Sequence, residues 1–124
     1  IVIDLDGTLT IDCPDLPYME KQPQAEVVKQ LLDYQKRGFS IIVATARNMR
    51  TYQNNVGMIN ALTLPGVIAW LDKHDIPYDE VHVGKPWCGH DGFYVDDRAV
   101  RPDEFVGKTY TEIRALLGLD AEGA

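Results

Sequence analysis

Short apolar runs that alternate with segments of helical periodicity restrict the fold of this sequence more than any other feature. Four such runs are too short for ordinary helices and suit buried strands. They are Ile1–Leu5, Phe39–Ala44, Val81–Val83 and Phe93–Val95. Because strands that alternate with helices are joined by parallel crossovers, the pattern predicts an α/β fold with an open, mainly parallel sheet in a three-layer, Rossmann-like arrangement.

Helix signals occupy the segments between the predicted strands. Pro23 opens a helix with apolar residues at i, i+3 and i+4 spacing, and Gly38 ends it. A second helix begins near Thr63 and cannot continue through Pro77. A last helix begins at Thr109, where Thr-Tyr-Thr-Glu has the spacing of a capping box.

Length and composition indicate a soluble globular chain. Its 124 residues, 45% hydrophobic and 25% charged, suit a single domain over residues 1–124. No apolar run approaches the roughly 20 residues of a membrane span, and the net charge of −7 argues against nucleic-acid binding. Cys13 and Cys88 are expected to be free thiols in the cytoplasm. Alternatively, both flank a common site.

Polar residues follow each predicted strand. They are Asp4 and Asp6, then Thr45 and Arg47, then Lys85, and finally Asp96 and Asp97. In parallel sheets, ligands bind just beyond the carboxyl ends of the strands, so these side chains are expected to meet. Two carboxylates about 4 Å apart repel by about 4 kcal/mol at an effective dielectric constant of 20, which a shared Mg²⁺ would offset.

The remaining side chains of this set suit a phosphate. Lys85 can neutralise phosphate charge, and Thr45 offers a hydroxyl to a phosphoryl oxygen. The forked donors of Arg47 match phosphate geometry, although a surface role is equally consistent with its polar surroundings.

These motifs resemble those of the haloacid dehalogenase (HAD) superfamily, whose members are mostly phosphatases. The segment Asp4–Thr10 (DLDGTLT) is similar to the first motif of the family, and Thr45, Lys85 and Asp96-Asp97 are similar to the second, third and fourth. The stretch Gly84–Arg98, together with residues 45–50, resembles the small HAD phosphatases of bacterial capsular polysaccharide biosynthesis.

The resemblance implies a role for each motif. Asp4 would be the nucleophile that forms an aspartyl-phosphate, and Asp6 would transfer protons to the leaving group and from water. Thr45 and Lys85 would hold the phosphate. Mg²⁺ would be bound by Asp4, the Asp6 carbonyl, Asp96 and, directly or through water, Asp97.

The resemblance is to the capless type of this superfamily. The intervals from Asp6 to Thr45 and from Thr45 to Lys85 cannot hold a cap, since an independent domain needs about 50 residues or more. Short loops or a second copy of the chain would then cover the site. The candidate covering loops are residues 11–22, 48–60 and 87–91, and residues 47–62 are ambiguous between helix and loop.

Other side chains are candidates for substrate contact, each with a structural alternative. They are Gly7 and Thr8 for the phosphate, and Asn48, Arg50, Trp87 and His90 for the rest of the substrate. Gly7 suits an ordinary turn, Trp87 suits packing, and the other polar residues of this group suit a solvated surface.

The function that this sequence favours is a Mg²⁺-dependent phosphatase acting on a small phosphate ester, such as a sugar phosphate of surface-polysaccharide synthesis. A phosphotransferase or mutase would use the same aspartyl-phosphate. A receiver-type signalling module also combines acids, Thr, Lys and Mg²⁺, but it is expected to carry its paired acids at the first strand and its phosphoacceptor later. A noncatalytic subunit of a polysaccharide complex is a third alternative.

Overall fold

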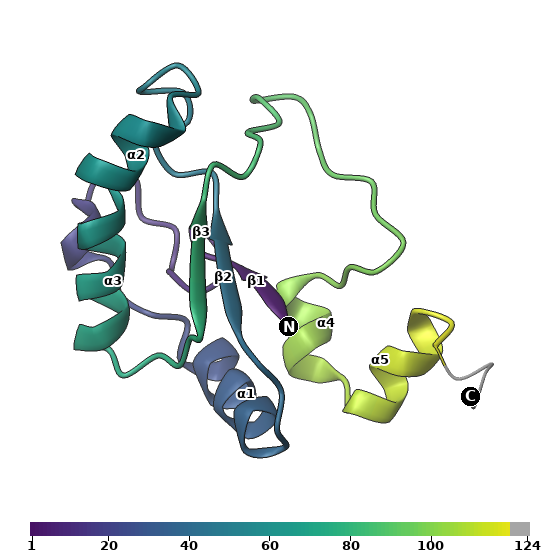
Figure 1. Ribbon diagram of the computed structural model, residues 1–124. Helices are drawn as coiled ribbons and strands as arrows, with labels where there is room; N and C mark the ends of the chain where they lie inside the picture. The colour runs from purple at the N-terminus through teal and green to yellow at the C-terminus, as the bar shows by residue number, and fades with distance from the viewer. Residues whose placement is uncertain (120–124) are drawn as a thin grey trace. The chain divides into compact units, whose positions relative to one another are not determined.

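A computed structural model describes residues 1–119 of the chain (Figure 1). The chain divides into two compact units, Ile1–Trp87 and Cys88–Ala124, and each is described by itself. The expectation of a single domain over residues 1–124 therefore stays a prediction.

Three parallel strands form the sheet of the first unit. They are β1 (Val2–Asp4), β2 (Ile42–Thr45) and β3 (Glu80–Val83), in the order β1-β2-β3 (Figure 1). Ile3 and Val43 are register partners and both are buried, while exposed Val2 pairs with half-buried Ile42. Alternate residues of these strands thus face a covered side of the sheet, where the core of the unit lies.

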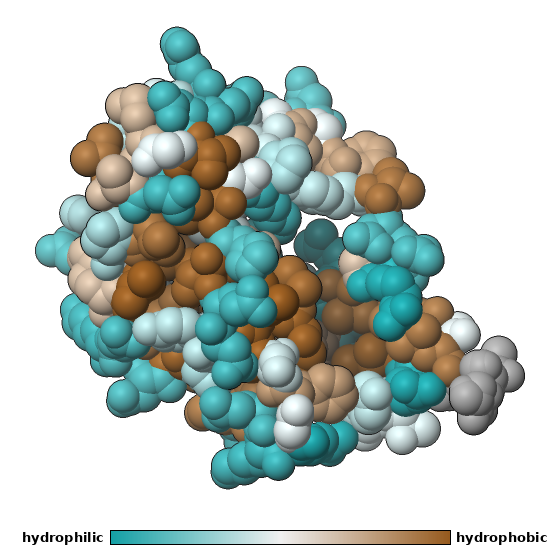
Figure 2. Space-filling view, viewed as in Figure 1, coloured by the Kyte–Doolittle hydropathy of each residue, from teal (hydrophilic) through white to brown (hydrophobic). Residues whose placement is uncertain are grey.

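Helices connect the strands as the parallel order requires. The connection from β1 to β2 contains α1 (Ala25–Lys36), and the connection from β2 to β3 contains α2 (Val56–Leu62) and α3 (Leu64–Lys73). Hydrophobic side chains lie between α3 and the sheet, and hydrophilic ones cover the rim (Figure 2). The prediction of an α/β fold with a parallel sheet is confirmed, and these helices leave no room for a cap domain within either connection.

Local signals set the helix ends in the first unit. The helix α1 ends just before Gly38, whose φ of +96° is a left-handed conformation that glycine adopts without strain. Thr63 is the N-cap of α3, as its sequence predicted. That helix already ends at Lys73, before Pro77 could break it. None of the helices in residues 1–119 combines the length and apolar character that a bilayer span requires.

Two helices make up the regular structure of the described part of the second unit. They are α4 (Pro102–Gly107), which the sequence analysis missed, and α5 (Tyr110–Leu116). The predicted capping box is present at α5: Thr109 Oγ1 accepts from the Glu112 N–H at 3.2 Å, and Glu112 Oε1 accepts from the Thr109 N–H at 2.9 Å.

The predicted strand at Phe93–Val95 is wrong. These residues have no regular structure, and the side chains of Phe93 and Val95 are 78% and 89% exposed. A strand needs a neighbour that completes its hydrogen-bond ladder, and no strand is found among residues 88–119.

Candidate active site

The turn after β1 is built by its own backbone and by two leucines. The N–H groups of Leu9 and Thr10 both donate to the Leu5 carbonyl, at 2.9 and 3.0 Å. Leu5 and Leu9 are fully buried, so they fix the turn to the core. Gly7 has a φ of +80°, and its N–H donates to Thr10 Oγ1 at 3.0 Å. The DLDGTLT sequence thus forms a rigid loop that presents its polar side chains beyond the strand.

Asp4 occupies the carboxyl end of β1 and is contacted on both carboxylate oxygens. Thr8 Oγ1 donates to Asp4 Oδ2 at 3.0 Å, and Lys85 Nζ lies 3.4 Å from Asp4 Oδ1. The Asp4 side chain remains 36% exposed, so a ligand can reach it. A lysine beside a partly open carboxylate supplies the positive charge that a bound phosphate needs.

Lys85 reaches Asp4 because β3 ends beside β2. Thr45 pairs with Val83 in the register, and the Lys85 N–H donates to the Thr45 carbonyl at 3.2 Å. Gly84 makes the intervening turn with a φ of +85°. The carboxyl ends of all three strands therefore lie at one edge of the sheet, and they bring Asp4, Thr45 and Lys85 together.

Thr45 is 1% exposed and its hydroxyl faces the loop that follows β2. Its Oγ1 accepts from the Arg47 N–H at 3.1 Å. A hydroxyl that accepts one hydrogen bond still has a hydrogen to donate. The Thr45 hydroxyl therefore retains a hydrogen for one further hydrogen bond.

The Asp6 carboxylate is bound by the guanidinium of Arg47. Arg47 Nε and Nη2 donate to the two carboxylate oxygens of Asp6, at 3.1 and 2.7 Å. Arg47 is 7% exposed, and its guanidinium lies 3.8 Å from the ring centroid of Tyr18. The fork that was expected to bind substrate phosphate thus orients Asp6, and the ring of Tyr18 covers it.

Tyr18 is a site residue that the sequence analysis missed. It begins the short 3₁₀-helix η1 (Tyr18–Glu20), inside a segment predicted to be a loop without regular structure. Nothing in the local pattern distinguishes this tyrosine from its neighbours. Only the tertiary contact with Arg47 connects it to the site.

The other predicted substrate contacts lie after β2 and β3. Asn48 Oδ1 accepts from Thr63 Oγ1 at 2.8 Å and Asn48 Nδ2 donates to Thr51 Oγ1 at 3.2 Å, so this amide ties its loop together. The Arg50 guanidinium lies 5.7 Å from the Trp87 ring centroid. Their contacts with a substrate stay predictions.

Asp96, Asp97 and His90 belong to the second unit and are exposed there. Asp96 Oδ1 accepts from the Arg98 N–H at 2.8 Å, which closes a local turn. The convergence of Asp96 with Asp4 stays a prediction. Cys13 and Cys88 are free thiols, as expected.

The donor set of the first unit suits a hard cation in part. The Asp4 carboxylate is open, and Mg²⁺ prefers one or two carboxylates completed by water and substrate oxygens. Within residues 1–119, no group of three or more His, Cys, Asp or Glu side chains is arranged to hold a metal ion.

A parallel sheet with an aspartate-lysine pair and a buried threonine at its carboxyl edge belongs to the α/β class, in which ligands bind beyond the carboxyl ends of the strands. The sequence profile of the haloacid dehalogenase-like hydrolases matches residues 1–70. The chain therefore belongs to the haloacid dehalogenase-like hydrolase family.

Two solved structures are similar to this chain. A crystal structure of an MCSG target from Vibrio cholerae is 55% identical, covers 95% of both chains and has a TM-score of 0.90. A structure of the Pnkp1/Rnl/Hen1 complex is 20% identical over 86% of this chain and 33% of that one, with a TM-score of 0.49. A comparison with curated protein sequences found no match.

Proposed function

We propose that this chain is a Mg²⁺-dependent phosphatase that hydrolyses a phosphate monoester through an aspartyl-phosphate on Asp4. The family supports a hydrolase. One observation carries the rest: the three strand ends bring the open Asp4 carboxylate, the Lys85 ammonium and the Thr45 hydroxyl to one edge of the sheet.

In the first step, an Asp4 carboxylate oxygen attacks phosphorus and the bond from phosphorus to the ester oxygen breaks. The Thr8 hydroxyl and the Lys85 ammonium orient the attacking carboxylate. Lys85 and Thr45 hold the phosphate oxygens, which spread the negative charge of the transition state. Asp6 enters this step protonated, and the departing oxygen takes that proton.

In the second step, water attacks the phosphorus of the aspartyl-phosphate and gives a proton to Asp6. The acyl-phosphate bond breaks, inorganic phosphate leaves, and Asp4 is regenerated. Arg47 donates two hydrogen bonds to Asp6 in the structure, so its role in this proposal is that of a positioning residue.

Mg²⁺ would be held by the carboxylates of Asp4, Asp96 and Asp97 and by the Asp6 carbonyl. Its charge would offset the repulsion between the carboxylates and the phosphate.

Phosphate release tests this function. The wild-type chain is expected to release inorganic phosphate from p-nitrophenyl phosphate and from sugar phosphates with Mg²⁺ and not with EDTA. Asp4→Asn should lower the rate by about 10⁴-fold or more, because the nucleophile is lost. Asp75→Asn is the matched control, since Asp75 is exposed and its φ of 54° suits asparagine equally well. Equal activity of Asp4→Asn and the control would refute the role of Asp4.

The resemblance of residues 84–98 to the capsular polysaccharide phosphatases supports a sugar phosphate as the substrate. A screen of sugar phosphates against nucleotides should show the highest kcat/KM for a sugar phosphate. Release of phosphate without an acceptor sugar would distinguish a phosphatase from a phosphotransferase or mutase.

We also propose that a second copy of the chain covers the open site, since neither connection of the sheet contains a cap. Sedimentation of the active protein is expected to show an oligomer. A monomer with full activity would contradict this proposal.

A further inference from the structure

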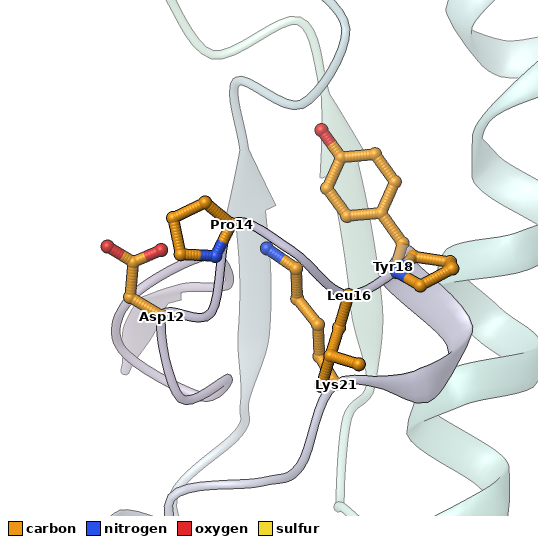
Figure 3. A pocket seen from close by; sticks show the side chains of 6 residues that line it. Asp12, Pro14, Leu16, Tyr18 and Lys21 are labelled. Atoms are coloured by element: carbon orange, nitrogen blue, oxygen red, sulfur yellow. The ribbon is translucent and has the colours of Figure 1, made fainter.

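A pocket in the first unit shares Tyr18 with the surroundings of the site and has no part in the proposed phosphate chemistry. Its volume is about 460 Å³, and it is lined by Asp12, Pro14, Leu16, Pro17, Tyr18 and Lys21 (Figure 3). All of these residues belong to the segment 11–22. The pocket reaches the site through Tyr18, whose ring stacks on the Arg47 guanidinium that holds Asp6.

The ends of this segment are tied to the rest of the unit. The Ile11 N–H donates to the Gln22 carbonyl at 2.8 Å, and Thr10 and Pro23 form an antiparallel bridge. The Trp70 indole N–H donates to the Lys21 carbonyl at 2.9 Å, and Trp70 is itself 1% exposed. Lys21 is therefore anchored by its backbone, and its pocket is formed before a ligand arrives.

Lys21 is the unusual residue of this pocket. It is only 8% exposed, and its amino group points into the space between Pro14 and Tyr18 (Figure 3). It forms no ion pair with any residue in the part of the chain that the structure describes. Its ammonium lies 5.2 Å from the Tyr18 ring centroid, a contact that leaves the three N–H donors without an oxygen acceptor.

A lysine whose side chain is largely buried while its ammonium opens into a pocket without an acceptor favours an anionic partner there. Lysine is seldom this buried without a partner. Asp12 also lines the pocket, but its carboxylate is exposed and makes no ion pair with Lys21. Pro14, Leu16 and Pro17 supply apolar surface beside the ammonium, against which the carbon atoms of a ligand can pack.

We propose that Lys21 and Tyr18 form a specificity subsite for a second anionic group of the substrate. The substrate class is then a phosphate monoester whose remaining part carries a carboxylate or another phosphate. This inference rests on the proposed function for its use in catalysis. Lys21 would pair with the second anion while the ring of Tyr18 packs against the carbon chain that connects the two groups.

Matched substrate pairs test the subsite. 3-Phosphoglycerate carries a carboxylate where glycerol 3-phosphate carries a hydroxymethyl group, and fructose 1,6-bisphosphate carries a phosphate that fructose 6-phosphate lacks. The wild-type chain is expected to have the higher kcat/KM for the member with the second anionic group in at least one pair. The pair that shows the preference identifies the second anion as a carboxylate or a phosphate.

Lys21→Met keeps the length of the side chain and removes its charge. It should reduce that preference by about 10- to 100-fold, since hydrogen bonds to charged groups are worth this much. Lys21→Arg should retain most of the preference. Lys36→Met is the control, because Lys36 is exposed on α1 outside the pocket. No preference in either pair, or equal losses for both members of a pair in Lys21→Met, would overturn the subsite.

A binding measurement separates this inference from the proposed function. Calorimetry with Asp4→Asn protein should show tighter binding of 3-phosphoglycerate or fructose 1,6-bisphosphate than of the partner ester, and Lys21→Met in the same protein should abolish the difference. If no ester is hydrolysed but this difference is present, the proposed function fails and the anion subsite stands. If the esters are hydrolysed and neither pair differs in binding, the subsite fails and the proposed function stands.

Discussion

Two segments of this chain have the same kind of sequence and very different structures. Ile1–Asp6 and Phe93–Asp97 are both short apolar runs followed by paired aspartates. In the first, Ile3 is 6% exposed and its neighbours form a strand of the sheet. In the second, Val95 is 89% exposed and no strand forms.

The difference lies in the neighbours of each run rather than in its own residues. β1 pairs with β2 along three register positions, and the turn after it is closed by hydrogen bonds to the Leu5 carbonyl. The described residues of the second unit provide no strand to pair with Phe93–Val95. An apolar run therefore favours a strand, but the strand forms only where a neighbouring strand pairs with it.

Shortening one apolar side chain in each run is the most direct test of this difference. Ile3→Ala should lower the free energy of unfolding by about 2–5 kcal/mol, because it leaves a cavity in the core. Val95→Ala should change it by less than about 0.5 kcal/mol, because an exposed side chain loses little. Urea unfolding followed by circular dichroism measures both. A loss above 2 kcal/mol for Val95→Ala would show that Val95 is buried in solution.

The two aspartate pairs can be compared by how a substitution in each changes the dependence of activity on the Mg²⁺ concentration. If Asp96 binds the ion with Asp4, Asp96→Asn should lower activity at limiting Mg²⁺ by at least about 10- to 100-fold. Loss of a residue that only hydrogen-bonds to a metal ligand already lowers activity or metal affinity by about this factor. Raised Mg²⁺ should restore part of this loss, whereas it should restore nothing in Asp4→Asn. Asp91→Asn, at another exposed aspartate of the second unit, is the control. An unchanged Mg²⁺ dependence in Asp96→Asn would exclude Asp96 as a ligand.

The buried threonine of the first turn offers a smaller effect. Thr10→Val keeps the shape of the side chain but removes the acceptor of the Gly7 N–H, so it should lower the free energy of unfolding by about 1–2 kcal/mol. Thr111→Val on α5 is an exposed control that should change little. Thermal melts of both variants measure the contrast, and equal melting temperatures would show that the Gly7 contact contributes nothing.

The smallest effect is expected at the capping box of α5. It is recognised by the pH dependence of the melting temperature. The hydrogen bond from the Thr109 backbone N–H lowers the pKa of Glu112 from its ordinary value of 4.5. A lowered pKa in the folded state adds stability above the pKa of the unfolded state, and that stability is lost as the pH falls through the folded value. Glu112→Gln should therefore lower the melting temperature slightly at pH 7 and not at pH 2. The same difference at both values would contradict the charge effect.

Most of the fold followed from local residues. The end of α1 before Gly38 and the capping box of α5 each depend on residues within a few positions, so the sequence shows them directly. The short helix α4 was missed although Pro102 is a favourable first residue, because six residues give too little periodicity to recognise.

The candidate site followed from the sequence only in its outline. The sequence predicted Asp4, Thr45 and Lys85 together, because parallel strands bring their carboxyl ends to one edge. It assigned the Arg47 fork to a substrate phosphate, whereas that fork binds both oxygens of Asp6. It gave no sign of Tyr18 or Lys21, since their importance comes from segments far along the chain.

In the first unit the sequence by itself determined the strand-helix alternation and the residues at the strand ends, because hydrophobic periodicity acts over a few neighbouring positions. Only the tertiary structure decided which carboxylate Arg47 holds and how far Lys21 is buried. These outcomes depend on side chains that are distant in sequence and meet after the sheet has formed. The burial of Lys21 and the pairing of Arg47 with Asp6 result from contacts between segments and cannot be read from any single segment.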